Sequence, residues 1–233
     1  LNPMMTCGRQ IVETITSHEK VSKAEAKERA LDMIRSVGIA RPEKVFSEVP
    51  AQLSGGMRQR IMIAMALICR PRLLICDEPT TALDVTVQAQ ILGLIRRLQK
   101  ETGTSVIFIS HDMGVISQMA DRVAVMYAGQ LVEYAEGEKI FTEPKHPYTQ
   151  GLQAAIPRLD EEKDTLLSIP GNVPMLYDLP KGCIFSPRCA HATEQCRNER
   201  PELVENSGHL VRCFLYEDNK KQTKSQSKGG AQA

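Results

Sequence analysis

The pattern of apolar and polar residues divides the first half of the chain into helices and short strands. Apolar residues recur at helical spacing in residues 11–38, 57–68 and 87–98, which predicts a helical segment in each. Two shorter apolar runs lie in residues 73–76 and 104–110, and such runs between turn residues are typical of buried strands. Continuous apolar strands belong to parallel sheets covered on both faces, so we expect an α/β fold.

Residues that favour helix ends stand at several of these boundaries. Ser22 and Glu25 form a capping-box pattern, and Gly38 stands where a C-terminal cap belongs. Gly103 ends the helix predicted at residues 87–98. One face of the segment at residues 11–38 carries the apolar side chains Ala26, Ala30, Leu31, Ile34 and Val37.

The second half of the chain changes character. Residues 121–127 and 130–134 read as two strands of a hairpin about Gly129. From Gly137 on, proline recurs at positions 144, 147, 157, 170, 174, 180 and 187, which disfavours long regular elements. The tail at residues 217–233 has almost no apolar residue, so we expect it to be disordered.

Composition narrows the class of protein. The 233 residues carry a formal net charge of +1, which gives no reason to expect nucleic acid as a partner. No apolar run approaches the ~20 residues of a membrane-spanning helix, and the first residues do not resemble a signal peptide. Seven cysteines without such a signal favour a reducing compartment, where metal or cluster binding is commoner than disulfides.

Two acidic residues end the first predicted strand. Asp77 and Glu78 follow the apolar run directly, and chemistry in open α/β sheets lies at the carboxyl ends of strands. One carboxylate there can hold Mg²⁺ through water, and its neighbour can polarise an attacking water. The alternative is an ordinary solvated strand end.

A glycine pair opens the helix predicted from residue 57. Ser54 is a suitable N-cap, and Gly55 and Gly56 allow close approach of a ligand to the backbone. A helix start binds anions, so phosphate is the expected ligand, although a plain capping turn has the same sequence. Arg58 and Arg60 point to different sides of this helix, and we expect structural contacts or hydrogen bonds to the neighbouring loop.

The combination of motifs is far more specific than each alone. LSGGMRQR at residues 53–60, DEPTTALD at 77–84 and ISHD at 109–112 follow in the order that resembles ATP-binding cassette (ABC) ATPases. Within that family, the chain is most similar to the subunits that power bacterial dipeptide and oligopeptide importers. KHPYTQGL at residues 145–152 and IPGNVP at 169–174 resemble the C-terminal extension of that group.

The resemblance implies a fold and a division into domains. It implies part of an ABC-type P-loop NTPase core, with a parallel sheet, flanking helices and a helical subdomain, followed by a small irregular extension. The implied domains are a helical signature subdomain at residues 1–70, the C-terminal part of a RecA-like core at 71–136, the extension at 137–216 and the tail at 217–233.

One family motif is missing from the sequence. No G-x-x-x-x-G-K-[ST] phosphate loop occurs in it, and in this family that loop lies upstream of the motifs found here. We therefore expect the chain to be the C-terminal part of a longer protein. A naturally short, degenerate paralogue remains the alternative.

The resemblance also gives roles to residues at the strand ends. It implies Glu78 as the catalytic carboxylate and His111 as the residue that contacts the γ-phosphate and orients the attacking water. Asp77 holds Mg²⁺ through water in this scheme.

The signature loop acts on a second subunit in the same scheme. Ser54, Gly55 and Gly56 contact ATP held on the opposite subunit of a head-to-tail dimer. Asp84 caps the next helix and communicates across the dimer interface.

The implied function is ATP hydrolysis that energises uptake of di- or oligopeptides, or related small solutes, with ATP and Mg²⁺ as cofactors. The implied partners are a second ABC ATPase, two membrane permease subunits and an extracytoplasmic solute-binding protein, and the implied location is the cytoplasmic face of the membrane. The alternative is a non-hydrolysing fragment or regulatory subunit that completes a partner's site. A soluble ABC protein of translation or DNA repair is disfavoured, since such chains usually carry two cassettes or a coiled-coil insertion.

Four cysteines gather near the end of the chain. Their number suits tetrahedral zinc or an iron–sulfur cluster, although their spacing matches neither common zinc modules nor bacterial ferredoxins. Resemblance to the peptide-importer extension favours a [4Fe–4S] cluster, while Zn²⁺ and plain reduced thiols stay open. The cysteines in question are Cys183, Cys189, Cys196 and Cys213.

Overall fold

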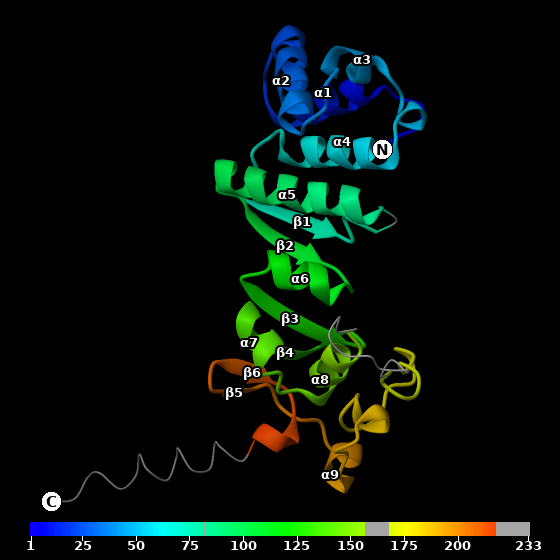
Figure 1. The fold of residues 1–233 in the computed structure, drawn as a ribbon, viewed down its shortest axis with the longest axis vertical. Helices are drawn as coiled ribbons and strands as arrows, with labels where there is room; N and C mark the ends of the chain where they lie inside the picture. Colours follow the sequence, from blue (N-terminus) through cyan, green and yellow to red (C-terminus); the bar gives the residue numbers. More distant parts are fainter. Residues whose placement is uncertain (82, 157–167, 218–233) are drawn as a thin grey trace, which may run out of the picture. The chain divides into compact units, whose positions relative to one another are not determined.

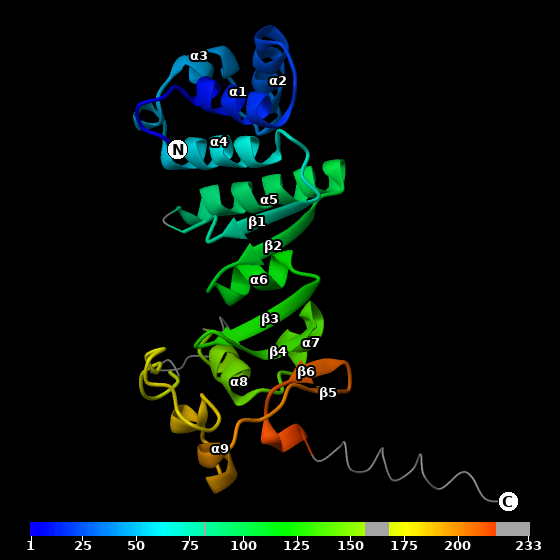
Figure 2. The ribbon, with the colours of Figure 1, turned by 180° about the vertical axis from the view of Figure 1, so that it is seen from behind.

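A computed structural model describes residues 1–81, 83–156 and 168–217, and the chain divides into two compact units, Leu1–His111 and Asp112–Ala233. Figures 1 and 2 show them from opposite sides, and each unit is described by itself below. The tail from residue 218 on, which we expect to be disordered, lies outside the described residues. No helix in the described part of the chain is both long and apolar enough to cross a bilayer.

The first unit begins with a group of helices. The segment predicted at residues 11–38 is two helices rather than one, because Glu19 leaves α1 in an extended conformation. Ser22 then begins α2, its hydroxyl accepting a hydrogen bond from the Glu25 N–H at 3.1 Å, as the capping pattern predicts. Gly38 lies in the left-handed region at φ +80°, which confirms the predicted helix end. The helices of this group are α1 (Cys7–His18), α2 (Lys23–Ser36), α3 (Pro42–Ser47) and α4 (Gly55–Leu67).

The core of this group is aliphatic. Each fully buried isoleucine stabilises the fold by about 2 kcal/mol relative to an exposed one. In α4, Met62 lies on the exposed side, whereas its neighbour Ile63 is buried. The fully buried aliphatic side chains are Ile11, Ile15, Ala26, Ala30, Ile34, Val37, Ile61 and Ala64.

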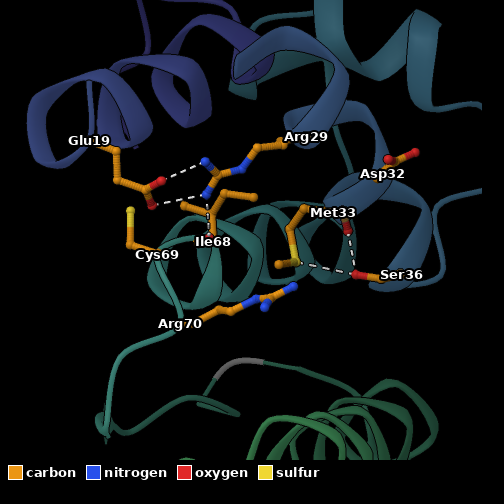
Figure 3. Close-up of a pocket in the computed structure, with 8 residues that line it drawn as sticks. All are labelled: Glu19, Arg29, Asp32, Met33, Ser36, Ile68, Cys69 and Arg70. Carbon is orange, nitrogen blue, oxygen red and sulfur yellow. Dashed lines mark hydrogen bonds and ion pairs between the residues drawn. The ribbon is translucent and has the colours of Figure 1, made fainter. Parts of the chain in front are cut away.

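The far ends of α1, α2 and α4 border a pocket of about 580 Å³ (Figure 3). Arg29 donates two hydrogen bonds to the Glu19 carboxylate there, at 2.6 and 2.9 Å. This pair lowers the pKa of Glu19, mainly through the hydrogen bond from Arg29. Because both groups are partly exposed, we assign the pair to helix docking rather than to chemistry.

Below these helices lies a two-stranded parallel sheet, with α5 (Val85–Thr102) against one face (Figure 1). Strands β1 (Leu73–Asp77) and β2 (Ser105–Ile109) pair in register, so that Asp77 lies opposite Ile109. Asp84 caps α5 by accepting a hydrogen bond from the Val87 N–H at 2.9 Å, which confirms the predicted cap. Gly103 ends the helix at φ +68°.

The prediction that the strands are buried throughout is wrong for this unit. In β1, burial alternates: Leu74 and Cys76 are buried, whereas Ile75 is 61% exposed. In β2, Ile107 and Ile109 are also exposed, on alternate residues of the strand. The sheet therefore has one covered face and one apolar face that the described residues of the first unit leave exposed.

The second unit is built on an antiparallel sheet with the strand order β3-β4-β6-β5. The predicted hairpin is confirmed, and Ala128 and Gly129 turn it at φ +44° and +77°. The last two strands come from the far end of the chain and extend the sheet from β4. The strands are β3 (Arg122–Tyr127), β4 (Gln130–Glu136), β5 (Val204–Asn206) and β6 (His209–Val211).

Short helices surround this sheet, as the recurring prolines predict. Gly137 begins α7 where an added Cβ would lie 2.6 Å from the Ala120 carbonyl oxygen, so the position requires glycine. The helices are α6 (Met113–Met119), α7 (Gly137–Thr142), α8 (Pro147–Ala154) and α9 (Glu194–Asn198), with 3₁₀ turns at Pro50–Gln52 in the first unit and at Ser186–Arg188 and Phe214–Tyr216 in the second.

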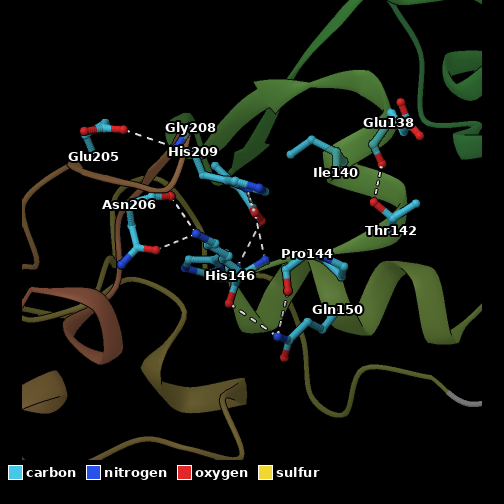
Figure 4. A network of polar contacts seen from close by, with 12 residues as sticks. Glu138, Ile140, Thr142, Pro144, His146, Gln150, Glu205, Asn206, Gly208 and His209 are labelled. Atoms are coloured by element: carbon cyan, nitrogen blue, oxygen red, sulfur yellow. Dashed lines mark hydrogen bonds and ion pairs between the residues drawn. The ribbon is translucent and has the colours of Figure 1, made fainter. Parts of the chain in front are cut away.

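A buried carboxylate ties the last strands to the sheet (Figure 4). Glu133 on β4 is fully buried and accepts hydrogen bonds from the Lys145 and His146 N–H groups at 2.8 and 3.0 Å. Its Oε1 also lies 3.0 Å from Nδ1 of the buried His209 on β6. Lys145 Nζ reaches Asn206 on β5 and donates to its carbonyl oxygen at 2.6 Å. Because a buried charge is costly unless hydrogen-bonded, this network fixes β6 beside β4.

Candidate active site

The two carboxylates predicted at a strand end lie at the carboxyl edge of the parallel sheet. Asp77 is the last residue of β1, and its side chain is exposed. The Glu78 N–H donates to the Ile109 carbonyl at 3.0 Å, which prolongs the β1–β2 pairing by one bond. Glu78 itself lies in the left-handed region at φ +47°, a conformation that costs an ordinary residue about 1 kcal/mol and is concentrated at functional sites.

This backbone brings Glu78 against His111, which follows β2. Glu78 Oε1 lies 2.8 Å from His111 Nδ1, and the His111 backbone N–H donates to the same oxygen at 3.2 Å. The other carboxylate oxygen, Oε2, accepts a hydrogen bond from the Thr81 hydroxyl at 2.7 Å. The two residues that the sequence places 33 positions apart therefore form one pair at the sheet edge.

The electrostatics of the pair favour the ionised carboxylate. The hydrogen bond from Thr81 is the largest cause that lowers the pKa of Glu78, and the hydrogen bond from His111 is the second. The side chains of Glu78 and His111 are 37% and 80% exposed, so a ligand can reach both. An ionised, accessible carboxylate beside an imidazole can orient and deprotonate a water molecule.

The predicted anion site lies at the start of α4. Ser54 caps this helix, its hydroxyl accepting from the Met57 N–H at 3.3 Å, which confirms the expected N-cap. A Cβ on Gly56 would lie 2.7 Å from Cγ1 of Val87 in α5, so this glycine permits close packing of two helix starts. The first turn of a helix leaves N–H groups without partners inside the helix, and these point to a ligand or to water.

The structure thus gathers the predicted residues in two groups. Asp77, Glu78 and His111 share the carboxyl edge of the sheet. Ser54 to Gly56 lie against the start of α5, the helix that Asp84 caps. The hydrogen bonds of Ser54 and Asp84 stay within their own helix starts.

Arg60 makes the structural contacts that the sequence predicts. It donates to the Val37 carbonyl at 2.5 Å and to Gln90 Oε1 at 3.1 Å, which joins the end of α2 to α5. Arg97 supports the same joint by donating to the Ser36 carbonyl at 2.5 Å. Sequence reasoning missed Arg97, because nothing near an exposed helical arginine in the sequence indicates that it binds a carbonyl group far away in the chain.

Thr81 was also missed. The signal was present, since a hydroxyl three residues after Glu78 can reach back across a turn.

The four clustered cysteines line one pocket of about 270 Å³ in the second unit, together with other side chains that include His146 and Phe185. All four are free thiols. Burial raises the pKa of Cys183 and Cys189, and that of Cys213 to about 11, which favours the protonated thiol.

The side chains do not form a metal site as they stand. Among the described residues, no group of three or more His, Cys, Asp or Glu side chains is arranged to hold a metal ion. The four cysteines expected to bind a [4Fe–4S] cluster or Zn²⁺ therefore line one pocket, but their side chains, as described, are not arranged to bind a metal together. Arg188, which precedes Cys189 in the sequence, donates to the Ile169 and Pro170 carbonyls at 2.9 and 2.8 Å.

Comparisons with known proteins agree with these motifs. The ABC transporter family matches residues 1–81, and the C-terminal region of oligopeptide/dipeptide transporters matches residues 132–196. The oligopeptide transport ATP-binding protein AppD of Bacillus subtilis is 52% identical over 219 residues, which is 94% of this chain and 67% of that protein.

Two further relatives show the same extent. The oligopeptide transport ATP-binding protein OppD of Salmonella typhimurium is 51% identical over 92% of this chain and 64% of its own length. The dipeptide transport ATP-binding protein DppD of Haemophilus influenzae is 51% identical over 91% and 64%. The chain spans about two thirds of the length of these relatives. It belongs to the ATP-binding proteins of the ABC transporter family, in the group that carries the oligopeptide/dipeptide transporter C-terminal region.

Proposed function

We propose that the chain belongs to an ATP-hydrolysing subunit of a bacterial ABC importer that energises uptake of di- or oligopeptides or related small solutes. The observation that carries this proposal is the pair of Glu78 and His111 at the carboxyl edge of the sheet, 2.8 Å apart. Relatives named for oligopeptide and dipeptide transport support the choice of solute.

In this proposal each residue at the sheet edge has one task. The Glu78 carboxylate accepts a proton from the attacking water, because its low pKa keeps it ionised. His111 donates its Nδ1–H to Glu78, so only Nε2 is left to contact the γ-phosphate. Nε2 carries a proton, and can donate it in a hydrogen bond, only when the ring is a protonated imidazolium. Asp77 would hold Mg²⁺ through water, and the ion would supply neutralising charge at the phosphates.

The start of α4 serves a second subunit. Ser54, Gly55 and Gly56 offer a hydroxyl and helix-start N–H groups to ATP held by a partner ATPase in a head-to-tail dimer. Asp84, at the start of α5, lies beside this loop and communicates across the same interface. ATP then favours the closed dimer, and hydrolysis removes the phosphate that joins the two subunits.

The remaining partners are two permease subunits and an extracytoplasmic solute-binding protein, with the ATPase at the cytoplasmic face of the membrane. We assign residues 1–70 to a helical signature subdomain, 71–136 to the C-terminal part of the RecA-like core, and 137–216 to the extension. The match of residues 132–196 to the peptide-transporter region supports the last assignment.

ATP hydrolysis by this chain, alone and mixed with a full-length partner ATPase, tests the proposal. Glu78→Gln removes the base, and Glu101→Gln on α5 is the matched control, since Glu101 is exposed and pairs only weakly with Arg97 at 4.0 Å. Hydrolysis that Glu78→Gln abolishes and Glu101→Gln preserves supports a catalytic subunit. Hydrolysis that persists in Glu78→Gln contradicts the proposal. So does a wild-type chain that shows no hydrolysis either alone or in the mixture.

A second function is favoured by one feature of the sequence. Ser54, Gly55 and Gly56 form a capped helix start, which can contact ATP held by a partner even where this chain does not itself hydrolyse ATP. A non-hydrolysing chain would then complete the partner's ATP site. Stimulation of the partner that survives Glu78→Gln but is lost when Ser54 is replaced by arginine identifies this case.

For the cysteine pocket we propose a [4Fe–4S] cluster, with Zn²⁺ as the alternative ion. Four thiols around one pocket support it. Because burial raises the pKa of Cys183, Cys189 and Cys213, metal binding must release protons from these thiols and turn the side chains toward a common centre. Iron, sulfide and zinc analysis of anaerobically prepared chain tests this proposal. Loss of the bound metal in Cys213→Ser is expected, and wild-type chain without stoichiometric iron or zinc contradicts it.

A further inference from the structure

Three donors converge on the two oxygens of Glu78. Oε1 receives the His111 backbone N–H and faces His111 Nδ1, at 3.2 and 2.8 Å. Oε2 receives only one protein donor among the contacts of the described residues, the Thr81 hydroxyl at 2.7 Å. The plane of the carboxylate is therefore defined by His111 on one side and by Thr81 on the other.

The turn after β1 places the Thr81 hydroxyl there. The Thr81 N–H donates to the Glu78 carbonyl at 3.3 Å, which closes a four-residue turn. Pro79, the second residue of that turn, fixes its own φ, while Glu78 takes a left-handed φ of +47°. This combination folds the first and last side chains of the turn onto each other.

We infer that Thr81 is a positioning residue for Glu78, and that its hydroxyl holds the carboxylate in the orientation from which Oε1 meets His111. The effect of Thr81 on catalysis rests on the proposed hydrolytic function, whereas its effect on the orientation of Glu78 does not. A carboxylate held at one oxygen only can rotate about its last side-chain bond, and Glu78 has no tight packing to prevent this because its side chain is 37% exposed.

A purely structural role for Thr81 predicts something different. If the hydroxyl only stabilised the turn, its removal would lower stability and leave the Glu78–His111 pair unchanged. Thr81 is exposed, so its side chain contributes little packing. A change in the surroundings of His111 when the Thr81 hydroxyl is removed therefore distinguishes the positioning role from the structural one.

Nuclear magnetic resonance of the ¹⁵N-labelled chain tests the geometry without any assay of hydrolysis. Thr81→Val removes the hydroxyl at nearly constant shape, and Thr81→Ser keeps it. We expect the His111 amide and imidazole signals to shift, and the amide to exchange faster, in Thr81→Val but not in Thr81→Ser. Thr102→Val is the matched control, because the Thr102 hydroxyl donates to the Leu98 carbonyl at 2.7 Å inside α5. Unchanged His111 signals in Thr81→Val overturn the inference.

Kinetics supply the second readout, in the mixture with a full-length partner ATPase. Since misplacing a catalytic group by a fraction of an ångström costs about tenfold or more in rate, we expect Thr81→Val to lower kcat about tenfold with KM unchanged. Thr81→Ser should restore kcat, and full kcat in Thr81→Val again overturns the inference. If the His111 signals respond as expected while the wild-type mixture does not hydrolyse ATP, the positioning role stands and the proposed hydrolytic function fails.

Discussion

Acidification should unfold the second unit through one buried imidazole, that of His146. The ring is only 2% exposed, caps α8 by accepting the Tyr148 N–H at 3.0 Å, and packs 5.7 Å from the Phe185 ring. Burial lowers the pKa of His146 from 6.5 to about 4, and the nearby Glu133 carboxylate offsets this only in part.

The sign and size of the effect follow from that pKa. In the unfolded chain His146 takes up a proton below pH 6.5, whereas in the folded chain it stays neutral until about pH 4. Its contribution to stability is therefore present above pH 6.5 and is lost as the pH falls toward 4. The full loss is about 3 kcal/mol, of which about 2 kcal/mol falls between pH 7 and pH 5.

Urea unfolding followed by tyrosine fluorescence measures this loss. The chain has five tyrosines and no tryptophan, and all five lie in Asp112–Ala233, so the signal reports the second unit. His146→Asn keeps a capping side chain on α8 but does not titrate. We expect stability to fall by about 2 kcal/mol more in the wild type than in His146→Asn between pH 7 and pH 5. Parallel pH profiles for the two proteins would refute the reasoning, since other titrating groups are common to both.

Three further changes have defined outcomes. Asp84→Ala should destabilise the first unit by about 1 kcal/mol through loss of the α5 cap, measured by circular dichroism during urea unfolding, and Asp84→Asn should restore most of it. Gly56→Ala forces a Cβ to within 2.7 Å of Val87, so it should lower the melting temperature, and adding Val87→Ala should recover it. Glu133→Leu leaves the buried His209 Nδ1 without its acceptor, and we expect about 3 kcal/mol less stability by tyrosine fluorescence, with no loss for Glu136→Leu at the end of the same strand.

Much of the fold could be predicted where local chemistry determines it. Ser22, Ser54 and Asp84 begin helices because their side chains accept the N–H groups of the first turn. Gly103 and Gly129 occur at positive φ, as their places after a helix and within a hairpin predict. In the candidate site, the carboxyl ends of two apolar strands correctly place Glu78 beside His111.

The features that could not be predicted depend on distant contacts. The capping pattern at Ser22 predicts the start of α2, but nothing local in the sequence predicts the pairing of Glu19 with Arg29 ten residues later. The exposed face of the sheet could not be predicted from the sequence. Leu74 is buried and Ile75 is exposed, yet both side chains are apolar. The ligand geometry of four cysteines likewise depends on side-chain directions, which spacing along the chain does not specify.

The position of the candidate pair follows from the sheet and not from the loops around it. Asp77 lies opposite Ile109 in the register of β1 and β2, and the Glu78 N–H then bonds to the Ile109 carbonyl. A shift of the register by one residue would turn every side chain of β1 to the other face and carry Glu78 away from His111. The burial of Leu74 and Cys76 therefore favours this register, because a shift by one residue would expose both side chains. Orientation within the site is a separate matter, and among the described residues it depends on the turn that brings Thr81 to the carboxylate.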